Sequence, residues 1–330
     1  MSITLPIVDI AALFDEDSAE ITQTTTALHH AFSEIGFAIV INHGVTAETI
    51  ADMRAAIKAV FDTPRDILAK QTVEKGNYRG FVPLGYFTPN SGKGKADQYE
   101  AWKLHTETPL DDPICERSSL YRPNRWPDIS ADVRTPILTY WDAMTRVSNA
   151  VLTALCNALG INAEYVLSCM PNPLTNMTLL NYPPMEPQSD AWGIHPHKDF
   201  NLLTLLAHDP IGGLEVRTRS GAWISAQCPP DGLVMNVGDM LELWSGGRLM
   251  STPHRVINRS GQPRQSFPYF SVPRYDVMIE PLLPFIEGYE RQPLHVGRSS
   301  ADIWYSNWPD TVSTEPGQEL GNFGEEEVAN

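Results

Sequence analysis

The chain has 330 residues, 42% of them hydrophobic, which is enough to form a large packed core in one or two domains. Its 24 basic and 40 acidic residues give a formal net charge of -16 at pH 7. Because nucleic acids and anionic membranes repel an acidic protein, we expect neither as a partner, and the charge is expected to serve solubility.

The first half of the chain is predicted to be mainly helical. Helices are expected over about residues 18–35 and 46–61, and a buried strand at Phe37–Ile41 separates them. Gly36 is expected to end the first helix, since glycine readily adopts the left-handed conformation that ends many helices. The second helix is expected to end before Pro64.

The clearest helix is predicted over about residues 131–159, and Gly160 is expected to end it. Apolar side chains recur there every three or four positions, which predicts a single apolar stripe along the helix. We expect this stripe to pack on a barrel formed by the second half of the chain. The stripe consists of Val133, Ile137, Tyr140, Met144, Val147, Val151, Leu155 and Leu159.

From about residue 174 the pattern changes to short strands separated by turns that are rich in glycine. Many short and evenly spaced strands predict a β-sandwich or a barrel-like jelly roll. A further helical segment is expected near residues 301–308. The predicted strands are 175–182, 193–199, 202–208, 214–217, 223–226, 232–237, 241–244, 254–257 and 265–272.

Targeting signals and cysteine pairs are not evident. The N-terminal residues show no secretory signal pattern, and every apolar run is much shorter than the ~20 residues of a membrane helix. Cys115, Cys156, Cys169 and Cys228 are scattered without C-x-x-C spacing, which argues against a disulfide framework or a zinc ribbon. We therefore expect a cytoplasmic protein with reduced thiols. The sequence leaves the oligomeric state open.

His197, Asp199 and the distant His254 are the strongest functional candidates. Two histidines and one carboxylate form the facial triad that holds non-haem Fe(II) and leaves coordination positions open for oxygen chemistry. If residues 197–199 form a strand, His197 and Asp199 point the same way and can share one metal. Alone, an H-x-D triplet is a weak signal, because most such triplets bind no metal.

Four segments carry a resemblance to a known family, and it extends from near the N-terminus to about residue 310. Leu5–Asp9 resembles the family's opening strand, and Gly36–Val45 resembles its GF…NHG segment. Arg79–Phe81 resembles its R-G-Y/F segment, and His254–Val256 resembles the H-R-V around the distal iron ligand. The chain thus resembles the isopenicillin N synthase-like branch of the Fe(II)/2-oxoglutarate-dependent oxygenases.

The resemblance implies an α+β fold with an all-β core, a double-stranded β-helix (jelly roll) flanked by N-terminal and C-terminal helices. Residues 1–310 would form a single catalytic domain. Within it, residues 1–173 would be rich in helix, residues 174–285 would form the core, and a helical segment would extend to about 310. Residues 311–330 would form an acidic, flexible tail.

The resemblance also implies a dioxygenase that uses Fe(II), 2-oxoglutarate and O2, with His197, Asp199 and His254 as iron ligands. His195 shares their face if the strand alternates regularly, and would lie at the pocket rim or partner a polar group. The enzyme would oxidise an unactivated C–H bond of a small molecule, either an amino acid or a natural-product intermediate of secondary metabolism. Hydroxylation, desaturation or ring formation would result, with succinate and CO2 as coproducts.

The expected contacts of 2-oxoglutarate are Arg264, Ser266 and Tyr182. The planar fork of an arginine can donate two hydrogen bonds to a carboxylate, and a spacing of two places Ser266 beside it on a strand. Many relatives have asparagine where this chain has Leu180. We therefore expect that contact either to be lost or to be supplied by Asn181.

Substrate contacts are harder to predict. Arg79 stands where isopenicillin N synthase holds its substrate carboxylate, so we expect a carboxylate-bearing substrate there, although a structural arginine near a turn is an equal alternative. Further candidates lie in segments that form the mouth or the barrel lining in relatives, and aromatic residues among them are more often core. These are Phe87, Lys103, Phe200, Trp244 and Phe270.

Two other functions fit the same residues. One is an Fe(II)/O2 oxidase that does not use 2-oxoglutarate, as in the cyclisation by isopenicillin N synthase, and the R-x-S motif does not separate the two. The other is a non-catalytic barrel that binds a small ligand. Release of succinate during turnover distinguishes the first alternative, and substrate-dependent O2 uptake distinguishes the second.

Overall fold

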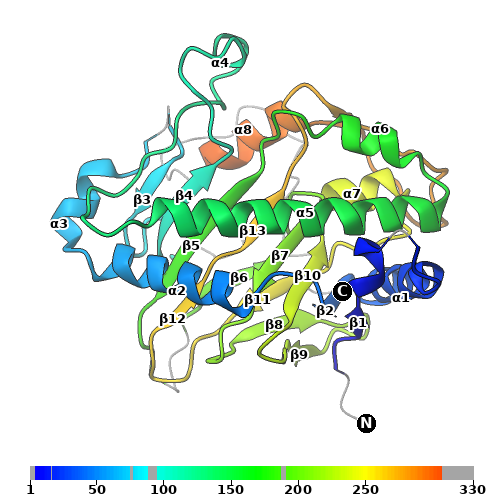
Figure 1. The fold of residues 1–330 in the computed structure, drawn as a ribbon, viewed down its shortest axis with the longest axis horizontal. Coiled ribbons are helices and arrows are strands. Elements are labelled where there is room, and N and C mark those ends of the chain that lie inside the picture. The colour runs from blue at the N-terminus through cyan, green and yellow to red at the C-terminus, as the bar shows by residue number, and fades with distance from the viewer. Residues whose placement is uncertain (1–3, 16, 75–76, 88–94, 187–190, 307–330) are drawn as a thin grey trace.

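The computed structural model of the chain describes residues 4–306, other than residues 16, 75–76, 88–94 and 187–190. Two β-sheets lie against each other, and the long helix α5 crosses the outer face of the larger one (Figure 1). The expected tail at residues 311–330 and the end of the helix expected at 301–308 fall outside the described residues.

The predicted helices of the first half are confirmed. Gly36 and Gly160 have φ values of 69° and 70°, so each adopts the left-handed conformation expected just after a helix. The helices are η1 Ala11–Phe14, α1 Ile21–Glu34, α2 Ala47–Asp62, α3 Arg65–Leu68, η2 Ala69–Gln71, α4 Ile114–Arg117, α5 Arg134–Leu159, α6 Ala163–Ser168, α7 Asp239–Trp244 and α8 Val296–Ser306.

The strands form a nine-stranded sheet, a four-stranded sheet and a separate pair. The large sheet has the order β1-β2-β10-β7-β13-β5-β4-β3, with β12 also paired to β5, and the smaller sheet has the order β6-β11-β8-β9. The strands are β1 Ile7–Asp9, β2 Phe37–Ile41, β3 Gly80–Val82, β4 Glu100–His105, β5 Asn176–Tyr182, β6 Ile194–His197, β7 Leu203–Ala207, β8 Leu214–Arg217, β9 Trp223–Ser225, β10 Leu233–Val237, β11 His254–Val256, β12 Arg264–Ser266, β13 Tyr269–Ser271, β14 Met278–Ile279 and β15 Leu294–His295.

Two expectations about the core require correction. The strand expected at 241–244 is the helix α7, in which every residue is buried, and a short apolar run of this kind does not distinguish the two structures. In addition, β1, β2, β3 and β4 come from the first 173 residues, yet they belong to the large sheet. The sheet therefore extends well beyond the segment that was expected to form the core.

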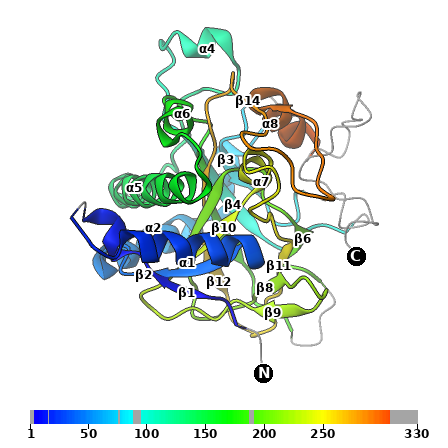
Figure 2. The same cartoon turned by 90° about the vertical axis from the view of Figure 1, so that its right-hand side faces the viewer.

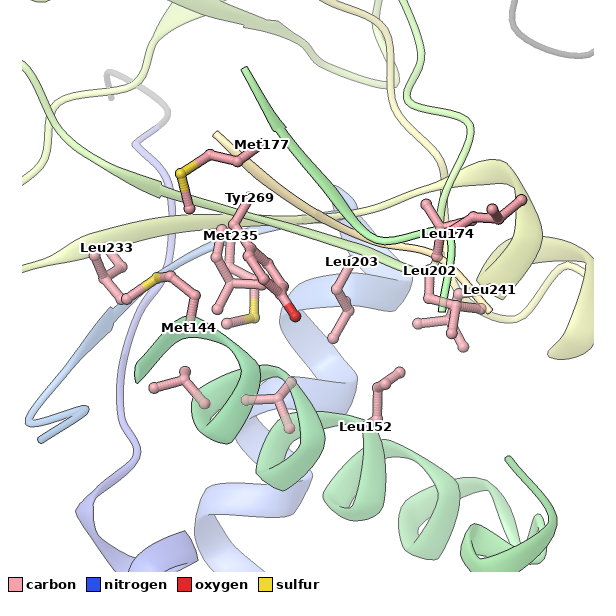
Figure 3. Close-up of a cluster of buried hydrophobic side chains, with 14 of the residues drawn as sticks. Met144, Leu152, Leu174, Met177, Leu202, Leu203, Leu233, Met235, Leu241 and Tyr269 are labelled. Atoms are coloured by element: carbon pink, nitrogen blue, oxygen red, sulfur yellow. The ribbon is translucent and has the colours of Figure 1, made fainter. Parts of the chain in front are cut away.

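The two faces of the large sheet have different roles. Along β5 and β7, Leu179 and Leu205 point toward α5, whereas the next residues, Leu180 and Leu206, line a cavity between the two sheets. Helices α1, α2 and α5 lie on the helical side of this sheet (Figure 2). The predicted apolar stripe of α5 packs there, against side chains that include Met177, Leu203, Met235 and Tyr269 (Figure 3).

Shortening one side chain of this interface measures what the packing contributes. Leu152 of α5 is fully buried, so Leu152→Ala removes apolar contacts and leaves a cavity. We expect the free energy of unfolding to fall by about 2–5 kcal/mol in urea denaturation. Leu110, whose surface is 68% exposed, provides the control, and Leu110→Ala should change stability by less than about 0.5 kcal/mol.

Candidate active site

The three predicted metal ligands meet at the edge of the smaller sheet. His197 ends β6 and His254 begins β11, and these two residues are directly paired in the antiparallel register. Asp199 follows two residues after His197. Its Oδ1 atom lies 3.7 Å from Nε2 of His197 and 3.6 Å from Nε2 of His254. The potential ligand atoms of the three residues all lie within 4.8 Å of one another.

Both histidines are held with Nε2 facing the carboxylate. Nδ1 of His197 lies 2.8 Å from the carbonyl oxygen of His195, and Nδ1 of His254 lies 3.1 Å from that of Thr252. Because a carbonyl only accepts, each Nδ1 carries the hydrogen and each Nε2 keeps a lone pair. Burial lowers the pKa of His254 to about 4 despite the adjacent carboxylate, so its ring is neutral and can bind a metal.

Asp199 is oriented by two donors from the large sheet. Its Oδ2 atom accepts hydrogen bonds from Thr204 Oγ1 at 2.5 Å and from Asn236 Nδ2 at 2.8 Å. Burial opposes ionisation, but the two imidazoles and these hydrogen bonds together hold the pKa of Asp199 below its usual value. The carboxylate is therefore ionised, and Oδ1 is left to face the histidines.

This donor set fits one metal ion. Two bonds of about 2.1 Å can join donor atoms that are up to about 4.2 Å apart, and the two nitrogen–oxygen distances of 3.6 and 3.7 Å lie within that span. Two imidazole nitrogens and one carboxylate oxygen on one side of an ion form the donor set of non-haem Fe(II) oxygenases. The side chain of His197 remains 28% exposed, which leaves an approach to the centre.

Removing the support of Asp199 should weaken metal binding without removing a ligand. Asn236→Ala deletes one donor to Oδ2, and we expect the affinity for Fe(II) to fall by about 10- to 100-fold. Anaerobic metal titration of the purified protein measures this. Asn157, exposed on α5, gives the control Asn157→Ala, which should titrate like the unmodified protein. Equal affinity in the two variants would contradict the proposed support.

Beside the metal ligands, the same cavity holds two buried donors that have no hydrogen-bond partner among the described residues. Arg264 is buried and donates through Nε to the carbonyl oxygen of Gly212 at 2.6 Å, but its Nη1 atom has no partner. Its guanidinium carbon lies 4.8 Å from the ring centre of Tyr182, whose hydroxyl also has no partner. Burial raises the pKa of Tyr182 to about 12, which keeps the phenol protonated as a donor.

These donors fit one end of a dicarboxylate. β12 pairs with β5 so that Arg264 lies opposite Tyr182 and Ser266 lies opposite Leu180. All four residues line the cavity that also contains the three predicted metal ligands. Buried polar groups rarely lack a hydrogen-bond partner, so the unpaired Nη1 atom of Arg264 and the unpaired hydroxyl of Tyr182 indicate a ligand. A carboxylate satisfies both groups, because arginine and phenol each donate and a carboxylate only accepts.

Asn181 does not join this pocket, contrary to the expectation from sequence. Alternation along β5 turns it to the face opposite Tyr182. There its Nδ2 atom donates to Glu100 at 2.7 Å, and its Oδ1 atom lies 3.5 Å from Nε2 of Gln265. Its side chain is therefore directed away from the cavity.

His195 also differs from the expectation of a shared face. The pairing of β6 with β11 shifts in register. Ile194 and His197 are three residues apart, but their partners Val256 and His254 are only two residues apart. Such a bulge breaks the alternation, and both Ile194 and His197 line the cavity while His195 does not. His195 is instead buried against Asp97, with Nδ1 2.6 Å from Oδ1. It partners a polar group, which was one of the two roles considered.

The predicted substrate contacts divide into two groups. Phe270 lines the cavity, whereas Phe87 packs beside Tyr78 in the adjoining apolar cluster. Phe200 and Trp244 belong instead to the core that packs on α5, so the expectation that they line the cavity is corrected. Phe200 packs against this core, and Trp244 lies in the unexpected helix α7.

The two predicted cations also have different surroundings. Arg79 is only 1% exposed and donates through Nη2 to the carbonyl oxygen of Leu120 at 2.8 Å. This contact favours the structural alternative for Arg79. Lys103 lies on β4 opposite Thr178, on the face of the large sheet that continues into the cavity. Neither residue contacts the three predicted metal ligands in the described part of the chain.

Three functional candidates were missed from the sequence: Thr204, Asn236 and Gly212. Asn236 and Gly212 contact residues that are 37 and 52 positions away, and Thr204 donates to Asp199 five positions before it. None of the three belongs to a motif with a fixed spacing from the residue that it supports. An alternation argument places Thr204 on the inner face of its strand but does not identify Asp199 as its partner.

Comparisons with known proteins show which family the chain resembles. A family model described as the N-terminal part of non-haem dioxygenases in morphine synthesis matches residues 5–129, and that of the 2OG-Fe(II) oxygenase superfamily matches residues 174–273. The chain is 32% identical over 295 residues to a homoarginine-6-hydroxylase of Arabidopsis thaliana, covering 84% of this chain and 87% of the relative. A homoarginine-6-hydroxylase of Oryza sativa subsp. japonica is 31% identical over 301 residues, covering 84% and 88%.

Solved structures share the fold. A full-length protein of Neurospora crassa, in complex with alpha-KG and thymine, has a TM-score of 0.80 at 22% identity, over 92% of this chain and 97% of that one. A 2OG-Fe(II) oxygenase family protein of Caulobacter crescentus has a TM-score of 0.76 at 26% identity, over 90% and 97%. The jelly-roll core expected from the sequence is thereby confirmed.

Proposed function

We propose that this chain, which belongs to the 2OG-Fe(II) oxygenase superfamily and is a 2-oxoglutarate-dependent dioxygenase, hydroxylates an amino acid or a related small acid. One observation carries the assignment of its site. Three converging ligand atoms, from His197, Asp199 and His254, share a cavity with the unpaired buried donors of Arg264 and Tyr182. We assign the first three residues to Fe(II) and the other two, with Ser266, to 2-oxoglutarate.

The residues of the chain position the reactants and exclude water. When bound, Fe(II) and 2-oxoglutarate supply the oxidising chemistry, which uses O2, yields succinate and CO2, and oxidises a C–H bond. Arg264 and Tyr182 hold one carboxylate of 2-oxoglutarate and so direct its other end toward the metal ligands. Asn236 and Thr204 fix Asp199 through its outer oxygen. Phe37, Leu206 and Val234 give the cavity apolar walls.

The proposal of an amino acid or related acid as substrate is supported by the names of relatives. Two of them are homoarginine-6-hydroxylases, and a third, from Hordeum vulgare, is a 2'-deoxymugineic-acid 2'-dioxygenase that is 29% identical over 286 residues. Hydroxylation is favoured over desaturation or ring formation for the same reason. An oxidase that needs no 2-oxoglutarate is disfavoured, since Arg264 and Tyr182 offer unpaired donors that suit a carboxylate.

Succinate formation tests this proposal directly. The purified protein with Fe(II), 2-oxoglutarate and O2 is screened against amino acids, related organic acids and neutral pathway intermediates, and succinate is measured with and without each compound. We expect at least one acid to stimulate succinate formation and to gain one oxygen atom, seen by mass spectrometry. Substrate oxidation that proceeds equally well without 2-oxoglutarate would favour the oxidase instead.

The cellular setting is proposed as cytoplasmic, and the branch of the superfamily as isopenicillin N synthase-like. Cys115, Cys156, Cys169 and Cys228 are all unpaired, which suits a reducing compartment. Among the described residues, no helix combines the length and the apolar character needed to cross a bilayer. The match of the N-terminal family model over residues 5–129 supports the branch.

A further inference from the structure

Lys103 projects from the same face of the large sheet that lines the active-site cavity. β4 and β5 are paired so that Ala101 lies opposite Leu180 and Lys103 lies opposite Thr178. Leu180 lines the cavity. Side chains of one face are spaced by two residues, so Lys103 stands about 7 Å beyond the Ala101–Leu180 pair along the same wall.

The ammonium group of Lys103 has no acid to balance its charge in the part of the chain that the structure describes. Its Nζ atom donates to Thr178 Oγ1 at 3.3 Å and lies 4.8 Å from the ring centre of Tyr78. Among the described residues, no carboxylate lies within ion-pair distance of it. The residue lies deep in the molecule, and burial lowers its pKa to about 8, yet its side chain keeps intermediate exposure. This combination is expected of a side chain that lines an internal space.

The described residues around Lys103 are aromatic, and none of them forms an ion pair with it. Tyr78 stacks on Trp304 of α8, with ring centres 5.3 Å apart. His105, two residues along the same face of β4, is buried, and its ring centre lies 4.7 Å from that of Trp304. Nε2 of His105 lies 3.2 Å from the carbonyl oxygen of Tyr78, so Nε2 carries the hydrogen. Nδ1 of His105 is therefore an acceptor, and it has no partner among the described residues. A cation and a free acceptor therefore lie side by side in a protein whose net charge is -16.

We propose that Lys103 binds a carboxylate of the substrate, an inference that rests on the proposed function and defines its substrate as a small organic anion. The apolar and aromatic surroundings strengthen a single ion pair there, because they screen it less than water does. The free Nδ1 of His105 suits a donor of the same molecule, such as an ammonium group. Arg79 donates through Nη2 to the carbonyl oxygen of Leu120.

The position of Lys103 suits an anchor at a distance from the chemistry. Strand β4 is separated from β7 by β5 and β13, so their backbones are about 14 Å apart along the sheet. Strand β7 carries Thr204, which holds the metal ligand Asp199. Lys103 is therefore too far away to bind the metal itself, whereas one small molecule can reach from Lys103 to the metal ligands.

A stability measurement tests the unbalanced cation without any knowledge of the substrate. Lys103→Met keeps the length of the side chain and removes its charge. If the charge serves a ligand and not the fold, the melting temperature of the ligand-free protein should rise, by about 2 °C or more. Lys58→Met, at an exposed lysine of α2 paired with Asp62, should leave it almost unchanged. A lower melting temperature for Lys103→Met would show a structural role and overturn the inference.

Binding to the holoenzyme tests the ligand. The acid that most stimulates succinate formation and its primary amide are titrated calorimetrically into protein loaded anaerobically with Fe(II) and 2-oxoglutarate. The unmodified protein and Lys58→Met should bind the acid about 10- to 100-fold more tightly than the amide, and Lys103→Met should lose this preference. The affinity for 2-oxoglutarate should stay unchanged in all three.

Each other outcome has a defined meaning. Unaltered binding of the acid by Lys103→Met, a best substrate without an anionic group, or weakened binding of 2-oxoglutarate would overturn the inference while leaving the proposed function intact. If no compound stimulates succinate formation, the proposed substrate class fails, and the melting temperature of Lys103→Met still decides whether Lys103 is an unbalanced cation.

Discussion

His197→Ala is expected to abolish stable binding of Fe(II) and, with it, all substrate-dependent succinate formation. The substitution removes one of three ligand atoms, and the two that remain, from Asp199 and His254, do not by themselves form the facial set. Because the side chain of His197 is 28% exposed, its loss should disturb the fold little. Metal analysis after anaerobic loading and desalting should show iron near one equivalent in the unmodified protein and near zero in the variant.

His195→Gln is the matched control for this experiment. His195 lies two residues away in the same strand but bonds to Asp97 and does not line the cavity. Glutamine can keep a hydrogen bond to that carboxylate, so the variant should retain its iron. Loss of iron in His195→Gln together with retention in His197→Ala would reverse the assignment of the two histidines. Circular dichroism of both variants separates loss of metal from loss of fold.

Strand and helix periodicity determine those features of this fold whose residues lie close together in one segment. The apolar stripe of α5 was predictable because its packing depends on residues three or four positions apart. The metal ligands were predictable because chemistry restricts them to a few residue types at a short spacing. In both cases the signal lies within one segment or in residues of unusual chemistry.

The predictions that were wrong have other physical origins. Alternation predicted one face for His195 and His197, but a single bulge between β6 and β11 turned His195 away. The same alternation, applied to β5, was sufficient to exclude Asn181 once Tyr182 was assigned to the pocket. The run that contains Trp244 is too short for its periodicity to distinguish a strand from a helix. The partners of Asp199 depend on register between strands, which local sequence does not determine.

Arg264→Met should weaken binding of 2-oxoglutarate by about 30-fold or more, because removing one partner of a buried charge pair typically costs about 2–5 kcal/mol. Its Nη1 atom is the unpaired buried donor of the cavity, and Tyr182 alone cannot replace its charge. The affinity of Arg264→Lys for 2-oxoglutarate should lie between those of the unmodified protein and Arg264→Met, since lysine keeps the charge but lacks the planar fork.

Calorimetric titration of 2-oxoglutarate into the iron-loaded, anaerobic protein measures these affinities without turnover. Arg259, an exposed arginine five residues before Arg264, provides the control Arg259→Met, which should bind 2-oxoglutarate normally. The affinity of each variant for Fe(II) should also remain unchanged, since Arg264 is not a metal ligand. If Arg264→Met binds 2-oxoglutarate as tightly as Arg259→Met does, the cosubstrate carboxylate is held elsewhere. The unpaired Nη1 atom of Arg264 must then bind another anion.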